Sequence, residues 1–190
     1  VLERKPTLTI CDFAGVFAES GGFIDAKRGW WATGCDGGHA DYYGNEWFAF
    51  DYRDTLKWIM IWPGTPNEFI PFQKIGESGN AGVYNWTVDG VAYSAPGSRH
   101  TRGGLDHFPL TDEYLLHGGS QWEAGGNARD MWAFAPDTKT FARLAAPNKD
   151  NEATNVYGSY DSLTQTMLYV RPLTLARKTL LYRYERMSNA

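Results

Sequence analysis

Eight residues in three loop segments have side chains suited to binding a polar ligand. Imidazole, amide and carboxylate groups hydrogen-bond to polar ligands or ligate cations, and a guanidinium clamps a carboxylate through two parallel hydrogen bonds. A tryptophan in a glycine-flanked loop offers a flat apolar face on which a sugar ring stacks. The residues that form this candidate ligand-binding face are His39, Asp41, Asn45, Glu46, Arg99, His100, Trp122 and Glu123.

Structural interpretations compete with ligand binding at the charged and amide positions. Asp41, Asn45 and Glu46 present oxygen ligands for a hard cation such as calcium, but their spacing is not that of a calcium-binding loop. Arg99 more readily clamps a carboxylate within the chain than one on a ligand. The sequence leaves the metal content of this face unknown and assigns no catalytic residue.

The four histidines also have structural interpretations. His39 and His100 lie in predicted loops, where an imidazole more often hydrogen-bonds to backbone carbonyls than to a ligand. His107 and His117 fall in or near predicted strands and are expected to be structural.

Other chemistries lack their sequence signatures. The chain has no G-x-S-x-G elbow, no H-E-x-x-H pair and no Walker-type phosphate loop. A net charge of −4 over 190 residues gives no basic footprint for nucleic acid. No apolar run approaches the roughly 18–20 residues of a membrane span. The two cysteines, Cys11 and Cys35, are interpreted as small buried thiols, with a disulfide as the alternative in an oxidising compartment.

The elements that position these residues are predicted to be short antiparallel strands. Aromatic residues make up 15% of the chain, beside 21 glycines and 9 prolines, a composition that favours pleated surfaces separated by tight turns. A hairpin is predicted around Val88-Asp89-Gly90-Val91. The predicted strands are Gly22–Asp25, Gly29–Thr33, Glu46–Tyr52, Leu56–Trp62, Gly103–Phe108, Glu113–His117, Met131–Ala135, Thr140–Leu144, Val156–Tyr160, Thr166–Val170 and Thr179–Tyr184.

These strands belong to a repeated unit. A glycine pair, an aromatic strand, an Asp-Thr turn and a further aromatic residue follow in the same order at residues 37–58 and 118–141. A weaker third copy without the glycine pair covers residues 160–184. Alternate connections of a meander lie at the same end of a sheet. The loops that carry the candidate ligand-binding face are therefore expected to converge on one face of the fold.

Two motifs resemble a known family. Residues 37–46 (GGHADYYGNE) followed by Trp47–Asp51, and residues 98–101 (SRHT) followed by 103–105 (GGL), are similar to bacterial kelch-repeat β-propellers of the galactose-oxidase central-domain class. The resemblance implies an all-β, kelch-type β-propeller with about three recognisable four-stranded blades. The blade units are residues 13–62, 98–146 and 153–190, with a long inter-blade insertion at 63–97.

Because propellers typically have about 4–8 blades, the resemblance predicts an incomplete ring. The chain is then part of a longer polypeptide or of an assembly, and further blades or subunits complete the ring. We expect a non-catalytic module that binds carbohydrate or protein, or a structural piece of an extracellular, cell-surface or virion-surface assembly.

The alternative is a copper-radical oxidase resembling galactose oxidase. That family holds copper with histidine and tyrosine ligands and cross-links a tyrosine to a cysteine. His39, His100, Cys11 and Cys35 supply the atom types, but no Tyr-His copper pair aligns. The expectation is therefore no cofactor, with copper or calcium as the alternatives, and neither nucleic acid nor a membrane span among the partners.

Overall fold

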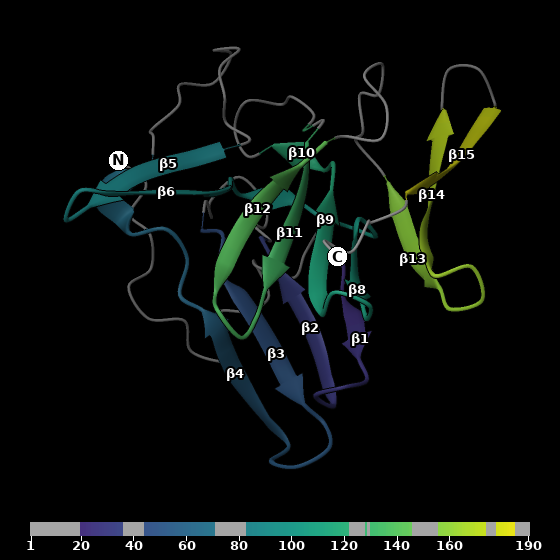
Figure 1. Cartoon of the computed structure of the whole chain (residues 1–190), viewed down its shortest axis with the longest axis horizontal. Helices are drawn as coiled ribbons and strands as arrows, with labels where there is room; N and C mark the ends of the chain where they lie inside the picture. The colour runs from purple at the N-terminus through teal and green to yellow at the C-terminus, as the bar shows by residue number, and fades with distance from the viewer. Residues whose placement is uncertain are drawn as a thin grey trace.

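The computed structural model describes residues 20–35, 44–70, 83–121, 128, 130–145, 156–173 and 178–184 (Figure 1). Regular structure in these residues is β-strand, apart from one turn of 3-10 helix, η2 (Asn67–Phe69). The prediction of an all-β fold is therefore confirmed. Among the described residues, no helix has the length and hydrophobicity needed to cross a membrane.

Three antiparallel meanders make up most of this structure. The first sheet joins β1 (Phe23–Asp25), β2 (Trp30–Gly34), β3 (Trp47–Asp51) and β4 (Lys57–Trp62) in chain order. The second sheet joins β8 (Leu105–Phe108), β9 (Glu113–His117), β11 (Met131–Ala135) and β12 (Thr140–Leu144). The third sheet joins β13 (Tyr157–Asp161), β14 (Thr166–Leu173) and β15 (Lys178–Tyr184). Each of these strands overlaps a strand predicted from the sequence.

Two smaller pairs of strands lie between the meanders. β5 (Val83–Val88) and β6 (Val91–Pro96) form the predicted hairpin, whose turn residues Asp89 and Gly90 both have positive φ, at 51° and 78°. Positive φ at both positions is the geometry of a type I′ hairpin turn. β7 (Arg99–His100) pairs with β10 (Ser120–Gln121). The hairpin occupies the segment predicted as an insertion.

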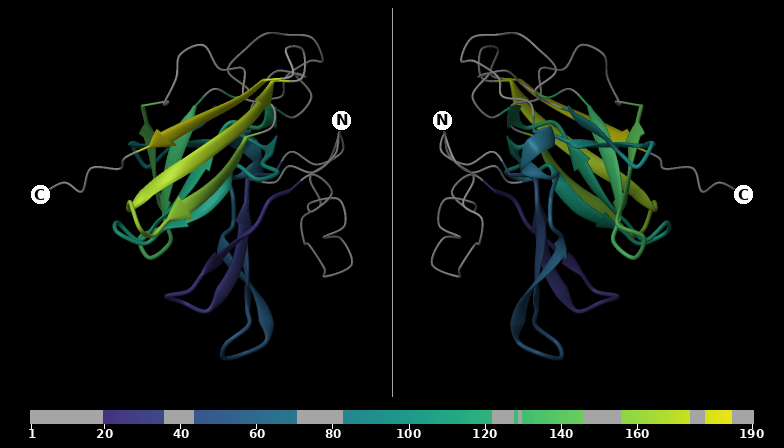
Figure 2. Two further views of the ribbon diagram at one scale, coloured as in Figure 1. Left: turned by 90° about the vertical axis from the view of Figure 1, so that its right-hand side faces the viewer. Right: turned by 90° about the vertical axis from the view of Figure 1, so that its left-hand side faces the viewer.

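The strands β9 and β11 of the second sheet are buried on both faces. Successive residues of a strand point to opposite sides. Tyr114 and Leu116 of β9 accordingly pack with the first sheet, whereas Leu115 packs with Met167 and Tyr169 of the third sheet. The three sheets therefore follow one another in chain order, as the side views in Figure 2 show. The apolar runs of β9 and β11 are explained by this central position, because neither face of these strands meets water.

The first strands of the three sheets lie next to one another. β8 contacts both β1 and β13. A backbone hydrogen bond of 2.7 Å from Gly158 to Gly103 joins the second sheet's entry to the third sheet. Two sheets have four strands, the third has three among the described residues, and these sheets do not form a closed ring (Figure 1).

Gly104 supports the start of the second sheet and gives a direct test of this packing. A Cβ at residue 104 would lie 2.4 Å from the carbonyl oxygen of His117 and 3.1 Å from that of Thr101, and backbone atoms cannot move aside cheaply. We expect Gly104→Ala to lower the free energy of unfolding by about 1–3 kcal/mol, measured by chemical denaturation. Gly90→Asn is the control, because a Cβ there has open space and asparagine tolerates positive φ. Equal stability of the two variants would contradict the prediction.

Candidate functional site

The structure divides the candidate ligand-binding face into two groups. Four of its residues, and one of the two cysteines, lie outside the described residues: His39, Asp41, Trp122, Glu123 and Cys11. The other four are described: Asn45, Glu46, Arg99 and His100. His100 is half-buried on β7, and the other three side chains are buried.

The described segments of this face meet at one end of the first two sheets. The backbone N–H of Arg99 donates to the carbonyl of Cys35 at 3.0 Å. The side-chain amide of Asn45 donates to the carbonyl of Pro96 at 2.8 Å. β7, which carries Arg99, also pairs with β10 from the connection inside the second sheet. Loops from two sheets are therefore held together at this end.

Arg99 forms an internal clamp at this meeting point. Its side chain is fully buried, and its Nη1 donates to Asp130 Oδ1 at 2.6 Å and to the carbonyl of Gly118 at 3.1 Å. Burial acts to raise the pKa of Asp130, but the Arg99 guanidinium outweighs it and holds that pKa below its usual value. Because both groups are ionised and enclosed, this pair serves the fold rather than a ligand.

Asn45 has a similar internal role. Its Nδ2 donates to Thr65 Oγ1 at 3.0 Å, and its Oδ1 accepts from the backbone N–H of Thr65 at 2.8 Å. With the bond to Pro96, the amide connects three segments of the chain. The thiol of Cys35 is buried beside the same proline carbonyl, with a sulfur–oxygen distance of 3.4 Å. These contacts fix the loops at this end of the first two sheets.

A second polar cluster joins the first and second sheets, and the sequence did not single it out as a site. We call it the inter-sheet clasp: Asp25, Arg28, His107, Asp112 and Tyr114. Arg28 binds both oxygens of Asp112, at 2.8 and 2.6 Å, and Asp25 Oδ2 at 2.8 Å. The hydroxyl of Tyr114 donates to the same Asp25 oxygen at 2.6 Å. One guanidinium therefore crosslinks the β1–β2 turn to the β8–β9 turn.

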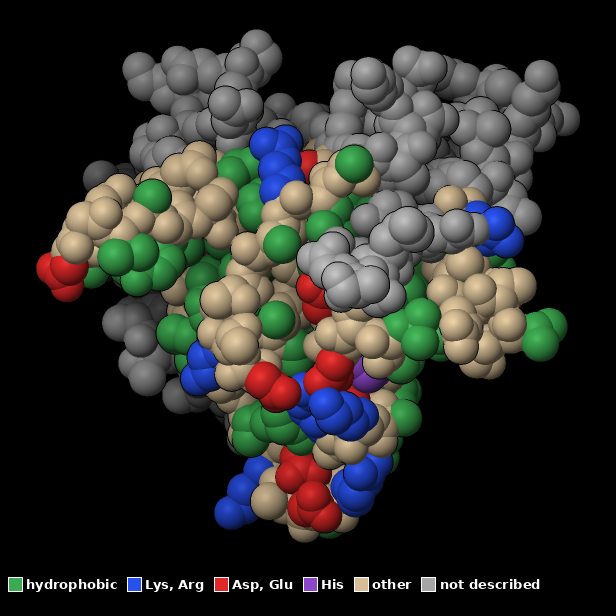
Figure 3. All heavy atoms as spheres, viewed as in Figure 1, with side chains coloured by type: hydrophobic (Ala, Val, Ile, Leu, Met, Phe, Trp, Pro, Cys, Tyr) green, Lys and Arg blue, Asp and Glu red, His purple; other side chains and the backbone are tan. Residues whose placement is uncertain are grey.

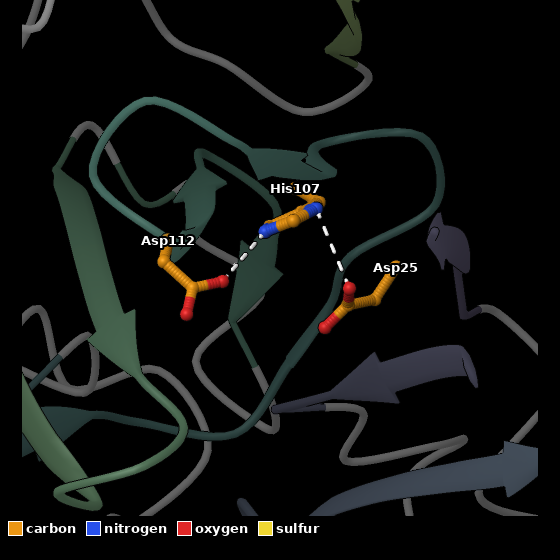
Figure 4. A group of neighbouring side chains, drawn as sticks. All are labelled: Asp25, His107 and Asp112. Atoms are coloured by element: carbon orange, nitrogen blue, oxygen red, sulfur yellow. Dashed lines mark hydrogen bonds and ion pairs between the residues drawn. The ribbon is translucent and has the colours of Figure 1, made fainter. Parts of the chain in front are cut away.

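His107 lies between the two carboxylates of the clasp (Figure 4). Its Nε2 is 3.1 Å from Asp112 Oδ1, and its Nδ1 is 3.7 Å from Asp25 Oδ1. The ligand atoms of these three residues lie within 4.8 Å of one another, which is close enough to hold a metal ion. Arg28 already places a positive charge against both carboxylates, and this charge opposes a second cation. The arrangement fits an ion-pair clasp better than a metal centre.

The third feature is a groove between the hairpin and the outer strands of two sheets. It encloses about 550 Å³, within the roughly 300–1,000 Å³ typical of small-molecule sites. The hairpin approaches β12 in Figure 1, and Figure 3 shows hydrophobic side chains on this projection at the left. The lining residues are Trp62, Gly64, Pro66, Trp86, Val88, Ala92, Tyr93, Ser94, Thr138, Lys139, Thr140 and Phe141.

Two aromatic pairs form the apolar walls of the groove. Trp86 and Tyr93, which face each other across the hairpin, stack with ring centroids 5.4 Å apart and an interplanar angle of 13°. Trp62 of β4 and Phe141 of β12 pack edge to face with ring centroids 4.8 Å apart. Tyr93 is 45% exposed, so one aromatic surface remains open to a ligand.

The groove also has polar side chains, most of which carry hydroxyls. Hydroxyls of Ser94, Thr138 and Thr140 lie beside the aromatic walls, and the two threonine oxygens are 2.7 Å apart. Among the described residues that line the groove there is no aspartate, glutamate, histidine or cysteine. These residues provide hydrogen bonds and apolar contact, and the titratable side chains among them are those of Tyr93 and Lys139.

The clasp predicts a specific acid sensitivity. Burial acts to raise the pKa of Asp112, but Arg28 outweighs it and lowers that pKa; the pKa of Asp25 is also below its usual value, with Tyr114 and Arg28 outweighing burial. Carboxyls with depressed folded-state pKa values stabilise the protein above their unfolded pKa of about 4. That stability is lost as the pH falls from there through the folded-state values.

We expect Arg28→Gln to lower the free energy of unfolding by about 3 kcal/mol at neutral pH. The loss of stability on acidification below about pH 4 should become shallower than in the parent protein, because the substitution removes the cation that depresses both pKa values. Chemical denaturation at a series of pH values measures both effects. Lys57→Gln, at an exposed site, is the control. Parallel pH profiles for Arg28→Gln and the parent would contradict a stabilising clasp.

Comparisons with known proteins do not place the chain in a family. No family model matches the sequence, and no curated protein matches it. The geometry of the described residues, above all the aromatic groove, is therefore the basis on which a function is assigned.

Proposed function

We propose that the chain is a non-catalytic module that binds carbohydrate in the groove between the hairpin β5–β6 and β12. The observation that carries this proposal is the aromatic lining of a groove with the volume of a small-molecule site. Four aromatic side chains from three separate parts of the chain line it: Trp62, Trp86, Tyr93 and Phe141.

Sugars match the surface chemistry of this groove. A pyranose ring presents a face of polarised C–H groups, which are attracted to the electron-rich face of an aromatic ring. Its edge carries hydroxyls that pair with Ser94, Thr138 and Thr140. A groove of this size suits a short oligosaccharide better than a protein surface, since specific protein interfaces bury about 1,200–2,000 Å².

Lys139 favours a sugar over a quaternary ammonium group as the ligand of the groove. Aromatic cages also bind quaternary ammonium groups through cation–π attraction. Lys139 is the charged residue among those that line the groove, and its positive charge repels such cations. The charge instead favours neutral sugars or sugars that carry a carboxylate or sulfate.

The same proposal assigns the three sheets to a kelch-type β-propeller. Successive antiparallel meanders that pack face to face, with their first strands side by side, support this assignment. A glycan-binding role suits a protein outside the cell or on a virion surface, where complex carbohydrates are displayed.

Substitution of the open aromatic wall provides the test. We expect the protein to bind oligosaccharides on a glycan array, and we expect Trp86→Ala and Tyr93→Ala to weaken that binding by about tenfold or more, because each loses a stacking surface. Isothermal titration calorimetry with the best array ligand measures the change in affinity.

Tyr52→Ala is the matched control for this experiment. Tyr52 is 40% exposed, close to the 45% of Tyr93, but it does not line the groove. It should retain the affinity of the parent protein. An array without a bound glycan, or equal affinity of the Trp86→Ala variant and the parent, would refute the proposal.

A further inference from the structure

The outward face of the first sheet carries an apolar row that crosses all four strands. Ile24 lies opposite Trp31, Trp31 opposite Phe50 and Phe50 opposite Trp58 in the strand register. The Trp58 ring packs edge to face against Trp31, with ring centroids 5.9 Å apart, and its centroid lies 5.6 Å from that of Phe50. Ile24 is 52% exposed and Met60, on the same face, is 53% exposed. We call these four residues and Met60 the first-sheet row.

The second sheet has the same row at the same place in its repeat. His107 lies opposite Tyr114, Tyr114 opposite Phe134 and Phe134 opposite Phe141. Here the row is covered by the first sheet, and Tyr114 and Phe134 are almost fully buried. Trp47 of the first sheet stacks on Phe134 with centroids 4.8 Å apart. In the second repeat, a neighbouring sheet therefore covers this row.

The third sheet repeats the arrangement once more. Tyr160 lies opposite Met167. Met167 is fully buried against Phe108 and Leu115 of the second sheet. Two successive rows are thus covered by the sheet that precedes them in the chain, and the first-sheet row stands where a preceding sheet would pack.

The other end of the series presents the complementary face. Tyr157 and Val170 lie opposite each other on the side of the third sheet that points away from the second sheet. Both are exposed, Tyr157 at 49%. A single chain therefore has exposed apolar side chains, Ile24 and Met60, on the face where a preceding sheet would pack, and exposed side chains on the face that a following sheet would cover.

We propose that two copies of this chain associate head to tail, with the third sheet of each copy packed on the first-sheet row of the other. Two copies supply six sheets, within the roughly 4–8 blades of closed propellers. A two-fold axis makes the two contacts identical and leaves neither end face open. Exposed apolar side chains at Ile24 and Met60 are explained by this contact, because contiguous apolar surface marks an interaction site.

Sedimentation equilibrium of the whole chain tests the proposal. The parent protein should have twice the mass of one chain. Ile24→Glu and Met60→Glu should each raise the dimer dissociation constant by about tenfold or more, because each places a charge in the contact. Both residues are more than half exposed, so circular dichroism should show folded variants.

Leu110→Glu is the matched control, since Leu110 is 50% exposed but lies in the β8–β9 turn, outside the first-sheet row. It should leave the dimer unchanged. A monomeric parent protein, open polymers in place of a dimer, or an unchanged dimer in Met60→Glu would each overturn the proposal. Oligosaccharide binding by the parent does not depend on the dimer, so each proposal can fail independently of the other.

Discussion

The packing of aromatic rows between consecutive sheets is the interaction on which this structure depends. Trp47 is fully buried between the first and second sheets, where it stacks on Phe134. Its ring centroid lies 5.8 Å from that of Tyr114. Each large apolar side chain that is fully buried contributes about 1.5–3 kcal/mol. Replacing a buried ion pair by well-packed apolar residues is often neutral, because the cost of desolvation offsets the Coulombic attraction. The aromatic contacts therefore supply most of the stabilisation between sheets, and the polar contacts determine how the sheets are aligned.

The buried polar groups perform that alignment at opposite ends of the sheets. At one end, Arg99 and Asn45 bind backbone carbonyls and join the loops of two sheets. At the other end, Arg28 joins the turns of the same two sheets through carboxylates. Figure 3 shows the consequence at the lower end of the molecule, where acidic and basic side chains lie next to one another. Such contacts are directional, so they specify one alignment among those that apolar packing alone would permit.

The groove lies beside the packed sheets and shares Trp62 and Phe141 with the core between them. Its walls come from the hairpin β5–β6 and from the outer strands β4 and β12, so the packing of the sheets determines its position. A binding site on a rigid scaffold can vary without disturbing the core. The groove has an exposed side chain that a ligand can contact, Tyr93, whereas Asn45 and Arg99 are buried.

The strands could be predicted from local features of the amino-acid sequence. The predicted strands at Glu113–His117, Met131–Ala135 and Thr140–Leu144 coincide with β9, β11 and β12. The Asp89-Gly90 turn was likewise predicted from two adjacent residues. Alternation along a strand and positive φ in a turn are set by neighbouring residues, so they can be recognised without knowledge of the fold.

The roles of the polar and aromatic side chains, in contrast, follow from how the sheets pack. Asn45 and Arg99 were candidates for ligand binding because of their side-chain types, yet both are buried in internal contacts. The clasp joins Asp25 to Tyr114 across 89 residues of sequence, and the groove combines side chains from the hairpin with two different sheets. Burial and proximity between distant segments depend on how the sheets pack, and no local pattern in the sequence encodes that packing.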